Sequence, residues 1–356
     1  MKKINFVLPA NYNRAVGGFK IVYQYANELA HRGNEVSITF LFNMRGKSFI
    51  LTGFEKTINS KLLTYVQHKN EVTWFNLDKK IKIYYDLTRP QDFPDADVVI
   101  ATAAPTTHIV SKLSESKGKK YYFIQNFETW FYKGSTERVN ETYRLGMTNI
   151  VISHELRDKV YNATNKEPEY LPNFYNHEEF FLENPIAQRK NTVSLINHIH
   201  DVKRTKLGLE ILAEVKKEIP DLTVELFGAY KPITELESYV NFTFNANSKQ
   251  LRKDIYGKSK IYLLPSVLEG WVLTGMEAMA SGATVISSRI GGITDYANDD
   301  NSILITPDDK ESFVTEIVRI LKNDSLRIKL AERALNDVQQ YEIGYSTDKL
   351  EELFLR

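Results

Sequence analysis

The feature that most constrains the fold of this 356-residue chain is a regular alternation of short hydrophobic runs with longer amphipathic stretches. The first pair is INFVLPA followed by GFKIVYQYANELAHRG, and the same switch recurs near residue 155 and through the second half. Short β-branched and aromatic runs that alternate with helical patterns are typical of parallel α/β units. The chain is therefore predicted to be α/β and, at this length, to form two domains.

The segment YLPNFYNHEEF, at residues 170–180, interrupts this alternation with proline, asparagine and aromatic residues. We expect a domain boundary there, with an N-terminal domain over residues 1–172 and a C-terminal domain over 173–335. Residues 336–356 are expected to form a helical tail that packs back on the N-terminal domain. Each domain is expected to be Rossmann-like, with the two facing across a cleft and ligands bound at the carboxyl ends of the strands.

Composition excludes several classes of protein. The 46 basic and 45 acidic residues leave a net charge near zero, which gives no global reason to bind nucleic acid. Without cysteine there is neither a disulfide framework nor a thiolate metal site. No apolar run approaches the roughly 20 residues of a spanning helix, and the first run stops at Pro9, too short for a secretion signal. We expect a cytoplasmic protein, either free or peripheral at the inner face of the cell membrane.

Two loops that follow predicted strands carry residues suited to an anion. In NRAVGGF, Gly17 and Gly18 let the backbone approach a ligand at the start of a helix. In HIHDVKRTK, cations precede a helix N-terminus, where the helix dipole disfavours them unless an anion binds. A purely structural turn and a solvated basic loop are the respective alternatives. Asp95 and Asp97 precede a strand, at the wrong edge of the sheet, so no metal site is inferred.

A third loop, LEGWVLTGMEAMASG at residues 268–282, places two glutamates eight positions apart. Glu269 follows a predicted strand, and Glu277 is expected within about the first turn of a helix that stops at Gly282. The backbone amides around Leu273 to Gly275 are suited to cradle a diphosphate. Glu277 either balances the helix dipole or accepts hydrogen bonds from ribose hydroxyls, and the spacing alone does not separate these alternatives.

Taken in order, these motifs resemble the retaining GT-B glycosyltransferases of family 4, the group 1 type, over almost the whole chain. The stretch LPSVLEGWVLTGMEAMASGATVISSRIGG is similar to the donor-site signature P-S-x-x-E-G, E-A-M-A-x-G and a glycine pair. Glu269 and Glu277, with seven residues between them, match its E-x7-E pattern. FIQNFETWFYKGSTERVNETYRLG and ATAAPTT look like bacterial members that build rhamnan, O-antigen or related surface glycans.

The resemblance implies a retaining hexosyl- or deoxyhexosyltransferase that uses a UDP-, GDP- or dTDP-sugar and needs no cofactor or metal. The acceptor would be a hydroxyl of a glycan, a teichoic-acid-like polymer or a lipid-linked molecule. Front-face substitution is implied, in which the departing phosphate helps to deprotonate the acceptor.

The resemblance also assigns roles to individual residues. Glu277 would bind the ribose, Glu269 the donor sugar, and Lys203, with Arg204 or Lys206 as alternatives, the diphosphate. The implied catalytic residues are Glu269, Lys203 and Arg204. Further donor contacts are implied at Gly17, Gly18, His198, Gly270, Val272, Leu273 and Thr274, and sugar or acceptor contacts are candidates at Thr102, Thr106 and Glu128.

Three positions depart from the family pattern. His198 stands in place of an arginine, Val272 in place of a glycine, and Ala101–Thr102 where a strand usually ends in histidine. These departures motivate an alternative, a non-catalytic GT-B partner or stabiliser subunit of a glycosylation complex, although such a subunit would not need both glutamates. A GT-B epimerase or phosphorylase is a further alternative, for which we find no additional acid–base groups.

Residues 45–82 hold eight basic and three acidic side chains, a net charge of +5, with aromatic residues interleaved. This composition suits contact with anionic lipid headgroups or with a phosphate-bearing acceptor. A solvated basic surface beside core aromatic residues is the alternative.

Overall fold

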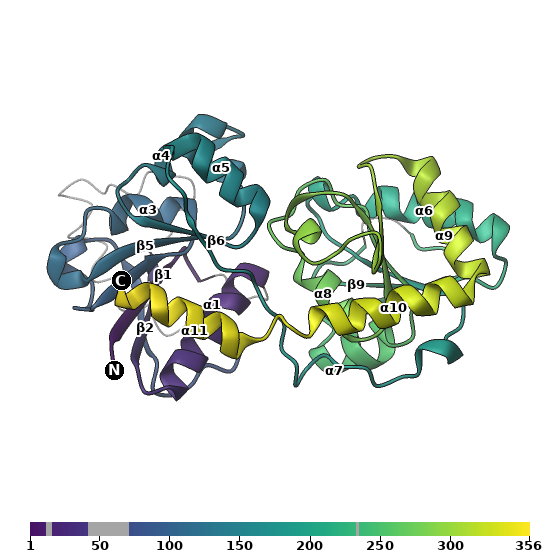
Figure 1. Cartoon of the computed structure of the whole chain (residues 1–356), viewed down its shortest axis with the longest axis horizontal. Helices are drawn as coiled ribbons and strands as arrows, with labels where there is room; N and C mark the ends of the chain where they lie inside the picture. The colour runs from purple at the N-terminus through teal and green to yellow at the C-terminus, as the bar shows by residue number, and fades with distance from the viewer. Residues whose placement is uncertain (12–15, 42–70, 233–234) are drawn as a thin grey trace. The chain divides into compact units, whose positions relative to one another are not determined.

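The chain folds into two compact units, each described here by itself from a computed structural model (Figure 1). The described residues are 1–11, 16–41, 71–232 and 235–356. Unit 1 consists of Met1–Pro172 and Ile343–Arg356, and unit 2 consists of Asn173–Glu342. The first boundary therefore falls inside the segment 170–180.

The predicted tail over residues 336–356 is divided between the two units. Helix α10 continues to Val338 in unit 2, because Asn323 caps its start and its apolar residues pack against α8 and β12. Only α11 (Ile343–Leu355) returns to unit 1, where Figure 1 shows it alongside α1.

Unit 1 is a seven-stranded sheet, parallel throughout, in the order β3-β2-β1-β4-β5-β6-β7. Its strands are β1 (Lys3–Leu8), β2 (Glu35–Leu41), β3 (Lys82–Leu87), β4 (Val98–Ala101), β5 (Lys119–Ile124), β6 (Thr148–Val151) and β7 (Glu169–Tyr170). Besides α11, its α-helices in the described residues are α1 (Gly17–His31), α3 (Ala104–Val110), α4 (Thr136–Tyr143) and α5 (His154–Thr164), with short turns at Pro90–Asp92, Glu115–Lys117 and Thr129–Tyr132.

The central strands of unit 1 are buried on both faces. From Ile4 to Leu8 every residue of β1 is buried, as expected for a parallel strand covered by helices. The one polar residue in that run, Asn5, accepts a hydrogen bond from the Thr39 hydroxyl on β2 at 3.0 Å. A buried amide with a partner is tolerated at little cost, so the run remains a strand.

Unit 2 repeats this architecture with six parallel strands in the order β10-β9-β8-β11-β12-β13. They are β8 (Thr192–Ile196), β9 (Thr223–Gly228), β10 (Val240–Phe244), β11 (Ile261–Leu264), β12 (Thr284–Ser288) and β13 (Ser302–Ile305). The helices are α6 (Thr205–Glu218), α7 (Ser248–Gln250), which continues as a π-helix over Leu251–Tyr256, α8 (Leu273–Ala280), α9 (Lys310–Lys322) and α10 (Asp324–Val338), with short turns at Ile186–Gln188, Asp201–Lys203 and Gly291–Asp295.

The helices of unit 2 pack in two pairs. Helix α6 lies against α9, and α8 lies against α10. An apolar cluster joins α6 and α9 to the inner strands and includes Leu195, Leu212, Leu263 and Phe313. The prediction of two parallel-sheet α/β domains is thus confirmed.

Candidate active site

Each sheet has one topological switch point, where successive connections leave in opposite directions. It lies between β1 and β4 in unit 1, and between β8 and β11 in unit 2. Ligands of open α/β sheets bind outside the carboxyl ends of the strands at such points. The loops after β8 and β11 contain the predicted donor residues, so strand order alone brings them together.

Lys203 and Glu269 meet directly at the switch point of unit 2. The Lys203 ammonium donates to both carboxylate oxygens of Glu269, at 2.6 and 2.7 Å. The Glu269 side chain is 8% exposed and that of Lys203 is 25% exposed. The two residues are 66 positions apart, and the family resemblance linked each of them to a ligand rather than to the other.

Helix α8 begins beside this ion pair. Its first residues, Leu273 and Thr274, are partly exposed, and their amides have no backbone acceptor among the residues that the structure describes. The first amides of a helix point along its axis and carry partial positive charge. Buried Gly270 lies between Glu269 and this helix start. An anion near Lys203 would therefore meet both a cation and free amides.

Glu277 lies in the second turn of α8, not in the first turn as predicted, because the helix already begins at Leu273. Its side chain is 6% exposed. The stabilisation of a carboxylate by the helix dipole fades beyond the first turn, so the dipole alone does not explain a buried glutamate here.

Buried tyrosines surround Glu277. The sequence did not predict these tyrosines as part of the site. They are Tyr256, Tyr262 and Tyr296, and burial, with a contribution from the nearby Glu277 carboxylate, raises the pKa of each phenol above its ordinary value. Tyr262 donates to the Thr274 hydroxyl at 2.9 Å. The phenols therefore stay neutral beside the Glu277 carboxylate.

The far end of α8 is held by a buried arginine. The Arg189 guanidinium is 7% exposed and donates to five backbone carbonyls, those of Asn184, Tyr256, Ser259, Ser281 and Gly282. The last two follow the C-terminus of α8, where a positive charge is favoured. Burial lowers the Arg189 pKa to about 10, so the side chain stays charged and anchors the helix.

Arg204 points to a different partner. Its guanidinium binds Asp308, in the loop after β13, through Nε at 2.8 Å and Nη2 at 3.1 Å. This hydrogen-bonded ion pair holds the pKa of Asp308 below its usual range. Strand β13 is separated from β11 by β12, so the structure brings Lys203, but not Arg204, together with Glu269.

His198 lies in an aromatic group at the ends of β8 and β9. Its ring centroid is 4.8 Å from that of His200 and 5.1 Å from that of Tyr230. Its Nδ1 accepts the His200 amide at 3.1 Å, which leaves the proton of the neutral ring on Nε2. A neutral imidazole has one N–H donor, where an arginine would supply a permanent charge.

In unit 1, the glycine pair and the first threonine also lie at the switch point. Gly17 begins α1, and a side chain at Gly18 would come within 3.2 Å of the Gln125 side chain, at the end of β5. The Thr102 hydroxyl donates to the Val7 carbonyl at 2.9 Å. Thr106 has no exposed surface and donates to the Ala103 carbonyl, which leaves it no route to a ligand.

Glu128, the third candidate for contact with the sugar or acceptor, is a buried carboxyl group in the loop after β5. It is 9% exposed, and its Oε2 accepts the Ala104 amide at 2.5 Å. Burial raises the pKa of this carboxyl to about 8. Nearby, the His108 ring is hydrogen-bonded to the Tyr132 hydroxyl at 2.9 Å, and burial is the main cause that lowers the pKa of His108. A neutral carboxylic acid can donate a hydrogen bond, so Glu128 can offer a proton to a hydroxyl at neutral pH.

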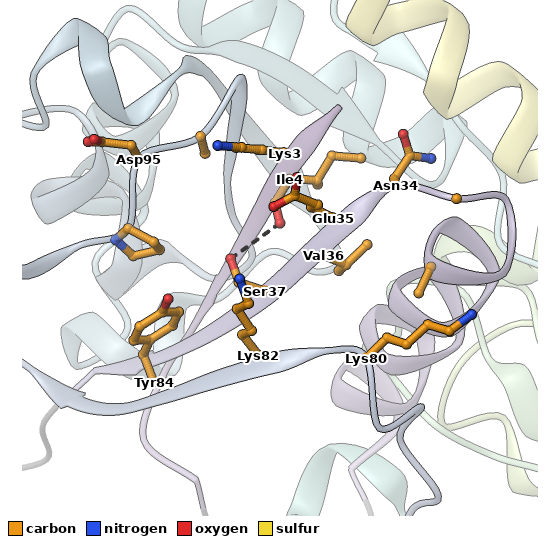
Figure 2. Close-up of a pocket in the computed structure, with 14 residues that line it drawn as sticks. Lys3, Ile4, Asn34, Glu35, Val36, Ser37, Lys80, Lys82, Tyr84 and Asp95 are labelled. Atoms are coloured by element: carbon orange, nitrogen blue, oxygen red, sulfur yellow. Dashed lines mark hydrogen bonds between the residues drawn. The ribbon is translucent and has the colours of Figure 1, made fainter. Parts of the chain in front are cut away.

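A cavity of about 560 Å³ opens at the opposite, amino-terminal edge of the unit 1 sheet (Figure 2). Figure 2 shows Lys82 and Tyr84 projecting from β3 on the same side, across from Lys3 on β1. Asp95 also lines it and forms an ion pair with Lys117 at 2.9 Å, while Asp97 accepts the Lys3 amide. Both acidic side chains thus have structural partners within unit 1.

The predicted basic segment over residues 45–82 lies mostly outside the described residues. Within the described part, Trp74 and Phe75 each pack 5.4 Å from the ring of Tyr23 on α1. In the described part of the chain, no helix is long and apolar enough to cross a membrane. Nor do the residues placed by the structure bring three His, Cys, Asp or Glu side chains into a group that could hold a metal.

The sequence of unit 2 matches the model of a known protein family. The family model described as "Glycosyl transferases group 1" matches residues 176–337. The match covers slightly less than half of the chain and lies wholly within unit 2. The matched residues include the Lys203–Glu269 pair, all of α8 and the Arg189 anchor.

Curated proteins with similar sequences are also named as sugar transferases, and their sequence identity to this chain is low. Sulfoquinovosyl transferase SQD2 of Arabidopsis thaliana is 26% identical over 165 residues, which cover 44% of this chain and 32% of that protein. D-inositol 3-phosphate glycosyltransferase of Corynebacterium aurimucosum is 29% identical over 101 residues, 28% of this chain and 24% of that protein. These matches span a third or less of the relatives. An uncharacterized glycosyltransferase of Haemophilus influenzae is 21% identical over 94% of both chains.

Solved structures extend the similarity to both units and show the fold. TarM of S. aureus, solved with fondaparinux, alpha-GlcNAc-glycerol and UDP, has a TM-score of 0.73 at 13% identity and covers 99% of this chain and 100% of its own. HepE of Anabaena, solved with UDP-glucose, has a TM-score of 0.74 at 13% identity over 99% of both chains. These neighbours are GT-B glycosyltransferases, and the fold of this chain is GT-B.

Proposed function

We propose that this protein is a retaining glycosyltransferase of family 4 that moves a hexosyl or deoxyhexosyl group from a nucleotide-diphosphate-sugar to an acceptor hydroxyl. One observation carries the proposal: among the residues that match the family model, the Lys203–Glu269 pair lies beside the free amides of α8, with Glu277 buried one turn further on. The cation and the amides suit the diphosphate of a donor, Glu269 its sugar and Glu277 its ribose.

The chemistry that follows is mainly the stabilisation of charge. As the glycosidic bond of the donor breaks, negative charge develops on the leaving diphosphate. The Lys203 ammonium and the amides of Leu273 and Thr274 would hold that charge in fixed positions. Glu269 would accept hydrogen bonds from the donor sugar, and Glu277 from the ribose hydroxyls. Retention would follow if the departing phosphate takes the acceptor proton on the same face, with no protein nucleophile required.

The Lys203–Glu269 ion pair has a consequence for donor binding. A diphosphate that approaches Lys203 competes with Glu269, so the ammonium passes from carboxylate to phosphate as the donor enters. Glu269 is then freed to accept hydrogen bonds from sugar hydroxyls. Both partners thus exchange one charged contact for another, which limits the desolvation cost of binding.

The structural neighbours indicate which donor classes to test first. TarM and HepE were solved with UDP or UDP-glucose, so UDP-sugars come first in a screen, followed by GDP- and dTDP-sugars. For the acceptor we propose a glycan, a teichoic-acid-like polymer or a lipid-linked molecule of the cell surface, and unit 1, with Gly18, Thr102 and Glu128, as its binding side. The reaction would take place in the cytoplasm, at the inner face of the membrane when the acceptor is lipid-linked, and would need neither cofactor nor metal.

Thermal unfolding with nucleotide sugars tests the proposal. At 100 times its dissociation constant a ligand stabilises the folded state by about 2.7 kcal/mol, so at least one UDP-, GDP- or dTDP-sugar should raise the Tm clearly. Glu277→Gln should lose most of this shift, because an amide replaces the carboxylate that accepts the ribose hydroxyls. Glu311→Gln, at an exposed position in the first turn of α9, is the matched control and should keep it.

The outcomes separate the alternatives. If none of the three donor classes raises the Tm of the wild-type protein, the glycosyltransferase proposal is wrong. Donor binding with neither hydrolysis nor transfer to any acceptor in a panel of glycans and lipid-linked sugars would favour the non-catalytic GT-B partner. That second candidate is kept because Arg204 is bound to Asp308, which leaves Lys203 as the cation beside Glu269.

A further inference from the structure

The residue that precedes α8 has an unusual backbone conformation. Val272 has φ 67° and ψ 67°, in the left-handed region. A β-branched residue is strongly disfavoured there, because its Cβ approaches the neighbouring carbonyl, whereas glycine adopts the conformation freely. The side chain is also 6% exposed, so the conformation is not simply that of a surface turn. Some contact must hold Val272 in place.

The Tyr296 hydroxyl provides that contact. It donates to the Val272 carbonyl at 2.7 Å, and the Gly275 amide donates to the same oxygen at 3.1 Å. Tyr296 is 4% exposed and comes from the loop after β12, and its ring packs 5.5 Å from that of Trp271. A rigid aromatic side chain from another loop therefore fixes the peptide that joins Val272 to α8.

Gly275 shows how closely this tyrosine is fitted. A Cβ built at Gly275 would lie 2.4 Å from the Tyr296 hydroxyl oxygen and 3.5 Å from the ring carbon that carries it. A side chain at position 275 would therefore collide with the Tyr296 hydroxyl, whereas the Tyr296 ring lies at an ordinary contact distance. Val272, Gly275 and Tyr296 thus form one interlocked unit, which we call the Val272 clamp.

We propose that Tyr296 is a positioning residue for the donor diphosphate: through the Val272 clamp it holds the amides of Leu273 and Thr274 in their ligand-binding direction. This inference rests on the proposed function. If Val272 relaxed to a right-handed or extended conformation, the peptide planes at the start of α8 would rotate and those amides would turn away. Where glycine would allow the left-handed turn by itself, this chain supplies a hydrogen bond from outside the turn.

A merely structural tyrosine would behave differently. It would contribute to stability, and its loss would lower the Tm without a specific effect on nucleotide affinity. The clamp predicts that the effect of Tyr296 on affinity depends on the residue at position 272. A double-mutant cycle measures that dependence directly.

The experiment measures binding of UDP, GDP and dTDP by calorimetry to four proteins: wild type, Tyr296→Phe, Val272→Gly and the double variant. Taking the nucleotide that binds wild type most tightly, Tyr296→Phe should raise the Kd tenfold or more. In the Val272→Gly background, the same change should raise it less than threefold, because glycine needs no clamp. Tyr341→Phe, which removes a hydroxyl donated to the Asp295 carbonyl at 2.9 Å, is the matched control and should leave the Kd within twofold.

A second arm needs no ligand. Gly275→Ala should lower the Tm, because its methyl group meets the Tyr296 hydroxyl, and adding Tyr296→Phe should restore part of the loss. If Tyr296→Phe weakens nucleotide binding equally in both backgrounds at position 272, or changes only the Tm as Tyr341→Phe does, the positioning role is refuted while the proposed function stands. If wild type binds none of the three nucleotides, the proposed function fails, and the inference fails with it.

Discussion

The free energy of unfolding of unit 1 is expected to fall as the pH rises, because Glu128 ionises in the unfolded chain. Glu128→Gln is expected to abolish this decrease. The Glu128 carboxyl is 9% exposed, and its hydrogen bond from the Ala104 amide does not offset the cost of burying its charge. The folded protein therefore holds the proton up to a pH of about 8, whereas the unfolded chain releases it near 4.5. Stability from this group is fully present below pH 4.5 and is lost as the pH rises to about 8.

The magnitude follows from the two pKa values. Each unit of difference corresponds to about 1.4 kcal/mol, so a shift from 4.5 to about 8 lowers the free energy of unfolding by roughly 5 kcal/mol across that interval. Glutamine cannot ionise and retains an oxygen that accepts the Ala104 amide. Glu128→Gln and wild type should therefore have nearly equal stability at pH 4.5, and the variant should be several kcal/mol more stable at pH 8.5.

Urea unfolding followed by tryptophan fluorescence measures this difference. The chain has three tryptophans. Trp74 and Trp130 belong to unit 1 and Trp271 to unit 2, so Trp271→Phe in both proteins makes the signal report on unit 1. Because His108 and the surrounding tyrosines are present in both, their titration cancels in the difference. A stability difference between the two proteins that stays constant from pH 4.5 to 8.5 would refute the reasoning.

Two further predictions concern the cations of unit 2. Lys203→Met should weaken nucleotide binding tenfold or more in calorimetry, and Arg204→Gln less than threefold, because Asp308 already holds the Arg204 guanidinium; a larger effect of Arg204→Gln would show that the arginine leaves Asp308 to bind the ligand. Arg189→Met should lower the free energy of unfolding of unit 2 by about 3 kcal/mol or more in urea titrations, since buried carbonyls such as that of Gly282 lose their donor. Arg189→Lys should recover part of that loss, and equal losses in the two variants would contradict this account.

The sequence was informative where a pattern is local. Alternating strands and helices predicted both sheets, and the patterns IYLLPS and TGMEAMASG predicted that Glu269 follows a strand while Glu277 lies inside a helix. The prediction that Glu277 lies in the first helical turn was wrong. No Ser, Thr, Asp or Asn caps α8, so no local sequence signal marks the first residue of this helix. The left-handed backbone at Val272 sets that start instead.

Contacts between distant positions could not be predicted in the same way. Arg204 finds Asp308 across 104 positions, and Tyr296 reaches Val272 across 24. Such pairs depend on which strands become neighbours and on the length of each loop. The raised pKa of Glu128 likewise arises from burial, which a sequence indicates for apolar residues but not for a single carboxylate in a loop.

The return of α11 to unit 1 determines the order in which the two units can be completed during synthesis. Tyr121 on β5 donates to the Leu353 carbonyl, Asn34 binds the Glu351 carboxylate, and Arg32 binds the same carboxylate. These contacts form only after residues 343–356 leave the ribosome, whereas unit 2 ends earlier in the chain, at Glu342. The sheet of unit 2 can therefore finish folding first, and unit 1 must wait, with the α11-binding surface of α1 uncovered, until α11 has been synthesised.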